Sequence, residues 1–182
     1  LKRGKNQKAE QIFEKKLRND NKNVLANYGM AWLHADSSFH STNLYEAYNF
    51  SQKAIIGFQQ LSVKKQKKIN TYLDDYPNVE ELDNWVLFKL AKQVRHSREI
   101  DKIEKFLQEI PYSGFHAPLE NMRDSIAFSK IEKQPTITGL QNFIATYPDA
   151  AQIEKANTML YQMRYKNALN ANTIEAFESF IR

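Results

Sequence analysis

Two histidines and an aspartate lie close together in the sequence and have the residue types of a metal site. His34, Asp36 and His40 could supply two imidazole nitrogens and a carboxylate oxygen, which are donors that zinc accepts. A structural zinc site needs a further ligand, and the six-residue step between the histidines runs from a predicted helix end into a loop. We therefore expect neither a metal site nor another cofactor, and predict a polar loop with His34 packed between helices.

The other titratable side chains form no catalytic pattern. His96 and His116 stand alone, without the serine and carboxylate of a nucleophilic triad. Adjacent acids such as Asp74 and Asp75 point different ways on a turn, whereas a glycosidase needs two carboxylates that face one cleft. The five glycines are scattered, and the chain has no cysteine, so phosphate loops and thiolate chemistry are excluded. The sequence predicts a protein that is not an enzyme.

Basic character is concentrated in the N-terminal third. Residues 1–68 carry 13 Lys/Arg against 5 Asp/Glu, and residues 69–182 carry 13 against 16, within a formal net charge of +5. The densest basic segment consists of Lys64, Lys65, Lys67 and Lys68. These lysines could contact an acidic protein segment or the phosphates of a nucleic acid, although no aromatic residue is interleaved to stack on bases. The alternative is an ordinary solvated helix face.

Trp32 and Trp85 are the only tryptophans, and both fall on predicted helices beside apolar residues at helical spacing. Tryptophan is a frequent anchor in protein interfaces, and the same spacing is also typical of core packing. We take these two residues, together with the four lysines, as the candidate partner-binding residues.

A repeat organises the chain that carries these residues. Phe106, Phe143 and Phe180 lie 37 residues apart. An earlier copy of the pattern places Tyr72 34 residues before Phe106. Residues around the phenylalanines recur in the same register, and the pairs include Pro111 with Pro148, Met122 with Met159, Phe128 with Tyr165 and Thr136 with Thr173. Such a period predicts an array of helical units. The units lie near 43–77, 78–111, 112–148 and 149–182.

Apolar residues recur at steps of three and four, so the elements must be helices joined by short turns. The first helices are predicted near 6–18 and 24–36, and a polar loop over 37–42 precedes a long third helix. A fourth helix is predicted from Ser62 to about residue 75. Each later unit has a longer helix followed by a shorter one, and Tyr-Pro or Ile-Pro ends the unit. We expect helix caps at Ser62, Ser97, Thr136, Asp149 and Thr173.

Composition is consistent with one all-α domain of about five antiparallel helix pairs. The chain has 182 residues with 42% apolar content and no Gly/Pro-rich linker, so we treat residues 1–182 as one domain. No apolar run approaches 18 residues, and we expect no membrane span. The last unit stops before its Tyr-Pro pair, and the chain begins with Leu1, so we expect a fragment of a longer protein.

The organisation resembles the tetratricopeptide repeat family over nearly the whole chain. Ala9 and Phe13 match the small and aromatic positions of a second helix, Asp20 and Asn23 match the inter-repeat turn, and Ala31 falls where the next first helix carries Gly or Ala. The match is divergent, because the C-terminal period is 37 rather than 34.

The resemblance implies a right-handed α-α superhelix that binds a protein or peptide in a concave groove. The first helices that would line the groove are those near 24–36, 79–95, 117–132 and 150–168. The 37-residue units also resemble repeat regions that precede other modules in cell-envelope proteins of Bacteroidetes-type bacteria, which implies the periplasmic side of the envelope, with the cytoplasm as the alternative. We expect a non-enzymatic scaffold with an acidic protein or peptide partner. A nucleic-acid-binding array and a structural spacer between flanking domains are the alternatives.

Overall fold

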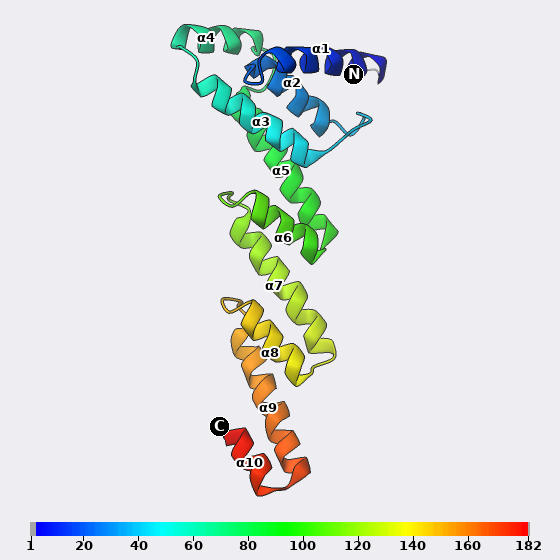
Figure 1. The fold of residues 1–182 in the computed structure, drawn as a ribbon, viewed down its shortest axis with the longest axis vertical. Helices are drawn as coiled ribbons and strands as arrows, with labels where there is room; N and C mark the ends of the chain where they lie inside the picture. Colours follow the sequence, from blue (N-terminus) through cyan, green and yellow to red (C-terminus); the bar gives the residue numbers. More distant parts are fainter. Residues whose placement is uncertain (1–2, 182) are drawn as a thin grey trace. The chain divides into compact units, whose positions relative to one another are not determined.

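The computed structural model describes residues 3–181, and this part of the chain is all-α, as predicted. It contains ten helices and no strand (Figure 1). The helices are α1 (Arg3–Asn19), α2 (Val24–Ala35), α3 (Leu44–Gln59), α4 (Val63–Tyr72), α5 (Val79–Ser97), α6 (Ile100–Glu109), α7 (His116–Lys133), α8 (Ile137–Thr146), α9 (Ile153–Ala171) and α10 (Ile174–Ile181). None of the described helices combines the length and the apolar character needed to span a lipid bilayer.

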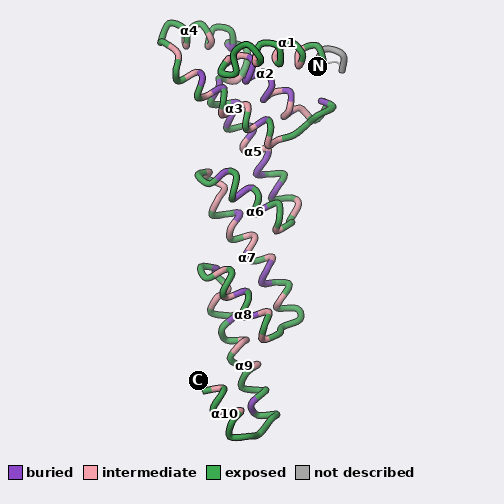
Figure 2. The backbone as a smooth tube through the Cα atoms, in the orientation of Figure 1, coloured by how far each residue is buried: buried purple, intermediate pink, exposed green. Residues whose placement is uncertain are grey.

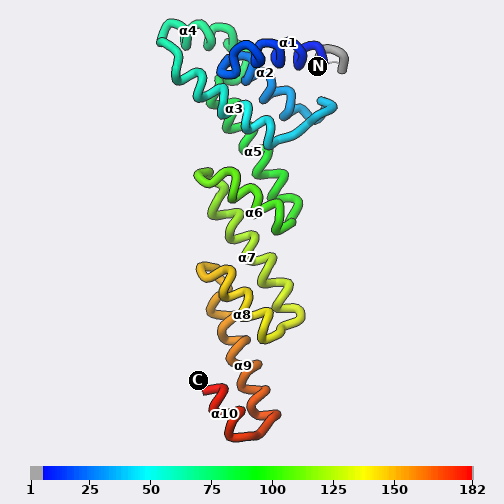
Figure 3. Tube along the Cα trace, viewed as in Figure 1, coloured from blue at the N-terminus to red at the C-terminus, as the bar shows by residue number. Residues whose placement is uncertain are grey.

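The chain divides into two compact units, Leu1–Gln93 and Val94–Arg182. The N-terminal unit contains α1 to α4 and most of α5, and the C-terminal unit contains α6 to α10 (Figure 3).

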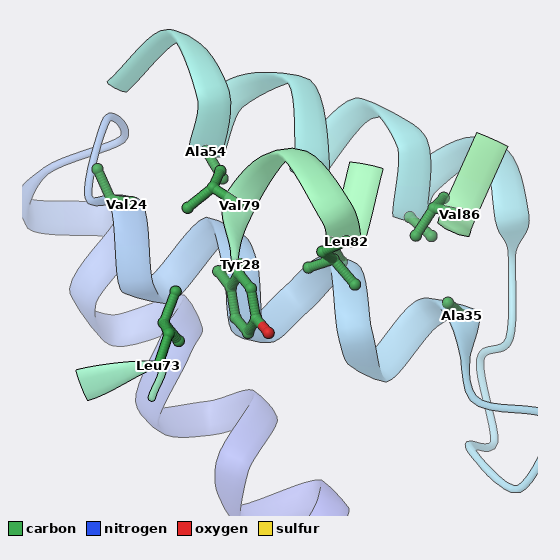
Figure 4. Close-up of a cluster of buried hydrophobic side chains, with 10 residues drawn as sticks. Val24, Tyr28, Ala35, Ala54, Leu73, Val79, Leu82 and Val86 are labelled. Carbon is green, nitrogen blue, oxygen red and sulfur yellow. The ribbon is translucent and has the colours of Figure 1, made fainter. Parts of the chain in front are cut away.

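Helices α2, α3 and α5 build the core of the N-terminal unit. Small side chains let α2 and α3 approach closely, since the distance between packed helices depends on the residues at the contact. The buried cluster consists of Val24, Tyr28, Ala31, Ala35, Ala47, Ala54, Leu73, Val79, Leu82 and Val86 (Figure 4). Helix α4 has no buried residue and is attached through half-buried Ile69 and the buried Leu73 that follows it (Figure 2).

The turn between α1 and α2 is fixed by a buried amide. Asn27 is 0% exposed, and its Nδ2 donates hydrogen bonds of 3.0 Å to the carbonyl oxygens of Asn21 and Asn23. The side chain of Asn23 accepts from the backbone N–H of Ala26 at 3.1 Å and so caps α2. This turn carries Lys22, which belongs to the candidate site.

The C-terminal unit shows the predicted alternation of long and short helices. Helices α7 and α9 have 18 and 19 residues, whereas α6, α8 and α10 have 10, 10 and 8. Phe106 and Phe143 are almost fully buried, at 0% and 2% exposure, and Phe128 of α7 packs on Phe143 with ring centroids 5.3 Å apart. The repeated phenylalanine is therefore the core residue of the short helix in these units.

The predicted caps at Thr136 and Thr173 are confirmed. Their hydroxyls accept from the backbone N–H of Gly139 at 3.0 Å and of Ala176 at 3.2 Å. Ser62 occupies the N-cap position of α4, although its side chain accepts no hydrogen bond there.

The predicted caps at Ser97 and Asp149 are wrong. Ser97 is still helical and donates to the carbonyl oxygen of Val94, and Glu99 is the N-cap of α6. Asp149 lies in a turn after Pro148 that delays α9, whose N-cap is Gln152. Helix α4 also ends at Tyr72, before the predicted boundary, because the chain turns there to bury Leu73.

Candidate functional site

The two tryptophans, 53 positions apart in the sequence, lie against each other in the N-terminal unit. Trp32 of α2 stacks on Trp85 of α5 with ring centroids 5.2 Å apart and an interplanar angle of 19°. Tyr28, one turn earlier on α2, continues the stack at 6.5 Å and 13°. Trp85 is 37% exposed, so part of its ring is open to solvent.

A lysine closes one end of the aromatic stack. Lys89, one turn after Trp85 on α5, holds its Nζ 4.5 Å from the Trp85 ring centroid. The same Nζ donates a hydrogen bond of 2.6 Å to the carbonyl oxygen of Ala35 at the end of α2. The ammonium group therefore ties α5 to α2 and adds a cation–π contact beside the exposed indole.

The hydroxyl of Tyr28 ties α2 to the segment before α5. It donates a hydrogen bond of 2.8 Å to the carbonyl oxygen of Pro77. Burial raises the pKa of Tyr28 to about 12, with smaller contributions from the nearby Tyr76 and Glu81. The neutral phenol is the form that the folded state requires.

The four lysines of α4 are all exposed, and the structure separates them into two pairs. Lys65 and Lys68 line a pocket of about 300 Å³ between α4 and the α1–α2 turn, whereas Lys64 and Lys67 do not line it. A step of three residues puts Lys65 and Lys68 on one side of the helix.

Two lysines that the sequence analysis did not single out complete this basic pocket. Lys16 of α1 and Lys22 of the following turn line it together with Lys65 and Lys68. They lie more than 40 residues before the α4 lysines, and no local pattern indicated that they would meet. The only sequence signal was the excess of basic residues in the N-terminal third.

One face of α2 joins the basic pocket to the aromatic stack. Leu25 lines the pocket, and Tyr28 and Trp32 follow at helical steps of three and four. Side chains at this spacing share a helix face. The six predicted residues thus fall into three groups: Trp32 and Trp85 in the stack, Lys65 and Lys68 in the pocket, and Lys64 and Lys67 outside both.

His34 lies in the last turn of α2 and His40 in the loop before α3, and packing and backbone contacts hold this segment. The ring of His34 stacks on Phe50 at 5.5 Å, and its Nδ1 donates to the carbonyl oxygen of Ser41 at 2.9 Å. The Nε2 of His40 lies 3.8 Å from the Oε2 of Glu10 on α1. Among the described residues, no three His, Cys, Asp or Glu side chains form a group that could hold a metal ion.

The geometry presents an aromatic surface and a cationic pocket on one unit, an arrangement suited to binding.

Comparison with known proteins places the chain in no family, because no family model matches it and neither a curated protein nor a solved structure is significantly similar to it.

Proposed function

We propose that the chain is a non-enzymatic scaffold that binds another protein or a peptide, and that its units form a divergent, tetratricopeptide-like right-handed superhelix. The observation that carries this proposal is the stack of Trp32 on Trp85. It joins α2 and α5, two of the helices expected to line the binding groove, and leaves the outer indole 37% exposed. An indole that is held by stacking on Trp32 and exposed over part of its ring can contact a partner and loses little conformational freedom on binding.

The repeat register supports the same function. Units that alternate a long and a short helix extend a continuous surface, and such arrays use that surface to bind other macromolecules. We propose the periplasmic side of a bacterial cell envelope as the compartment, from the likeness of the 37-residue units to envelope repeat regions.

The experiment uses the aromatic stack as its own probe. Trp32 and Trp85 are the only tryptophans, so selectively excited tryptophan fluorescence reports on this site alone. Peptides selected from a displayed library on the immobilised chain should share a sequence pattern, and their synthetic forms should change the tryptophan fluorescence on titration. Trp85→Ala should weaken binding of the labelled peptides by about tenfold or more, as expected of a central interface aromatic.

Tyr112→Ala is the matched control, because Tyr112 is an aromatic residue that is 99% exposed and lies in the C-terminal unit. The affinity of the Tyr112→Ala variant for the same peptides should equal that of the wild-type chain. Selected peptides that bind the Trp85→Ala variant as tightly as the wild type would exclude the aromatic stack as the binding site.

A further inference from the structure

The basic pocket combines two kinds of lining. Its charged and polar lining consists of Lys16, Asp20, Lys22, Asn23, Lys65 and Lys68. Its apolar lining consists of Val24, Leu25, Leu61, Ile69 and Tyr72. Its volume of about 300 Å³ is at the small end of ligand pockets and suits one or two side chains of a partner.

The basic pocket carries an excess of positive charge, with four lysines against the single carboxylate of Asp20 in its lining. None of these four lysines forms an ion pair in the described part of the chain. Three lysines of the C-terminal unit differ, since Lys102, Lys105 and Lys155 each pair with a glutamate. Four like charges around one pocket repel one another, and an anionic ligand would relieve that repulsion.

The one acidic group in the lining already has a structural role. Asp20 accepts a hydrogen bond of 3.1 Å from the backbone N–H of Lys22 and so helps to shape the α1–α2 turn. The buried Asn27 holds the same turn from the other side. The pocket is therefore preformed around Lys22, which lowers the entropy lost when a ligand binds.

The apolar lining distinguishes between anionic ligands. A single nucleic-acid strand binds by stacking successive bases on exposed aromatic rings along a groove. This pocket offers one exposed ring, Tyr72, and Lys68 lies over it with Nζ 5.8 Å from the centroid. The aliphatic residues instead suit a single apolar side chain between carboxylates.

We propose that the basic pocket binds an acidic peptide segment in which an apolar side chain stands between Asp or Glu residues. The inference rests on the proposed function as a peptide-binding scaffold and names the chemistry of the partner. The carboxylates would contact the lysines, and the apolar side chain would enter between Leu25, Ile69 and Tyr72.

The test measures fluorescence anisotropy of a labelled Asp-Glu-Asp-Leu-Asp-Glu-Asp peptide with the full chain. The double variant Lys65→Glu/Lys68→Glu should weaken binding by about tenfold or more, and Lys65→Gln/Lys68→Gln by a smaller factor. Lys64→Glu/Lys67→Glu makes the same charge change on the same helix outside the pocket, and should weaken binding by less than about threefold. Circular dichroism of each variant shows whether it keeps its helices.

Three further probes decide between ligands. The peptide with Asn and Gln in place of its acids, and the peptide with Gly in place of its Leu, should each bind more weakly than the acidic peptide by about tenfold or more. A labelled oligothymidine strand should bind less tightly than the acidic peptide. Equal loss in the two double-Glu variants would overturn the pocket as the site, and tighter binding of the oligothymidine would assign it to nucleic acid.

Failure of this inference is distinguishable from failure of the proposed function. Library-selected peptides whose binding depends on Trp85 but not on Lys65 and Lys68 would support the scaffold function. They would overturn the proposal that the ligand is an acidic peptide. Failure to select any peptide that binds the chain, together with no binding of the acidic peptide, would overturn both.

Discussion

At the scale of single residues, Tyr28 shows how one side chain connects the parts of the candidate site. Its ring continues the aromatic stack, and its hydroxyl binds the carbonyl oxygen of Pro77, 49 residues later in the chain. The side chain is only 7% exposed, which explains why burial is the largest cause of its raised pKa. The hydrogen bond needs the proton, so the contact depends on pH.

Stability should therefore fall in a defined alkaline window. The pKa of Tyr28 is about 12 in the folded chain and about 10 in an unfolded one. The stabilisation is complete below pH 10 and is lost as pH rises from 10 to 12, because the unfolded state then releases a proton that the folded state retains. Urea denaturation followed by circular dichroism should show this decrease in the free energy of unfolding.

Tyr28→Phe should lower stability at pH 8 by about 1 kcal/mol, through the lost hydrogen bond, and should show a smaller decrease between pH 10 and 12. Tyr112→Phe, at a 99% exposed position, should behave as the wild type. An unchanged pH dependence in Tyr28→Phe would contradict the assignment of the alkaline decrease to Tyr28.

At the scale of helices, the close packing of α3 on the α1–α2 turn positions the basic pocket. Gly57 of α3 is buried, and a Cβ atom there would lie 2.6 Å from the carbonyl oxygen of Lys22. Backbone cannot rotate away from such a contact as a flexible side chain can. Glycine at this position therefore permits the approach that sets the position of Lys22.

Gly57→Ala should destabilise the chain by about 1–3 kcal/mol despite the higher helix propensity of alanine. The steric conflict with the Lys22 carbonyl outweighs the propensity gain of about 1 kcal/mol. Gly114→Ala is the control, because a Cβ atom there would meet nothing within 4 Å. Thermal unfolding should separate the two variants, and equal or greater stability of Gly57→Ala would show that α3 can move away from the turn.

At the scale of the whole molecule, the close backbone contacts between helices join helices that are neighbours in sequence. In the described residues they join α1 to α2 and α2 to α3 in the N-terminal unit, and consecutive helices from α6 to α10 in the C-terminal unit. Arrays of this kind derive stability from each unit and its nearest neighbours. A local defect should therefore remain local.

Phe143→Ala tests that locality. Phe143 is 2% exposed in the cluster formed by α7, α8 and α9, and its truncation should cost about 3–5 kcal/mol. Hydrogen exchange should accelerate in α7 to α9 and stay unchanged in α2 and α3. Leu82→Ala, at a 0% exposed position of the N-terminal core, should give the converse pattern. Equal acceleration in both units would show that the chain unfolds as one cooperative body.

The sequence by itself determined the helices and much of their order. Apolar spacing, proline positions and the 37-residue register are local properties, and they predicted the long and short helices and the caps at Thr136 and Thr173. The predicted caps at Ser97 and Asp149 were wrong, because the residue that starts a helix depends on how the preceding turn closes. Only the structure placed Glu99 at the N-cap of α6.

The candidate site was decided by tertiary structure. The sequence indicated Trp32, Trp85 and the lysines of α4 one by one, but nothing local placed one indole on the other or brought Lys16 and Lys22 to Lys65 and Lys68. Periodicity reports which face of a helix is buried and carries no information about which distant helix covers it. The packing of α2 against α3 and α5, with glycine and alanine at the close contacts, determines which helices meet. It thereby assembles the aromatic stack and the basic pocket.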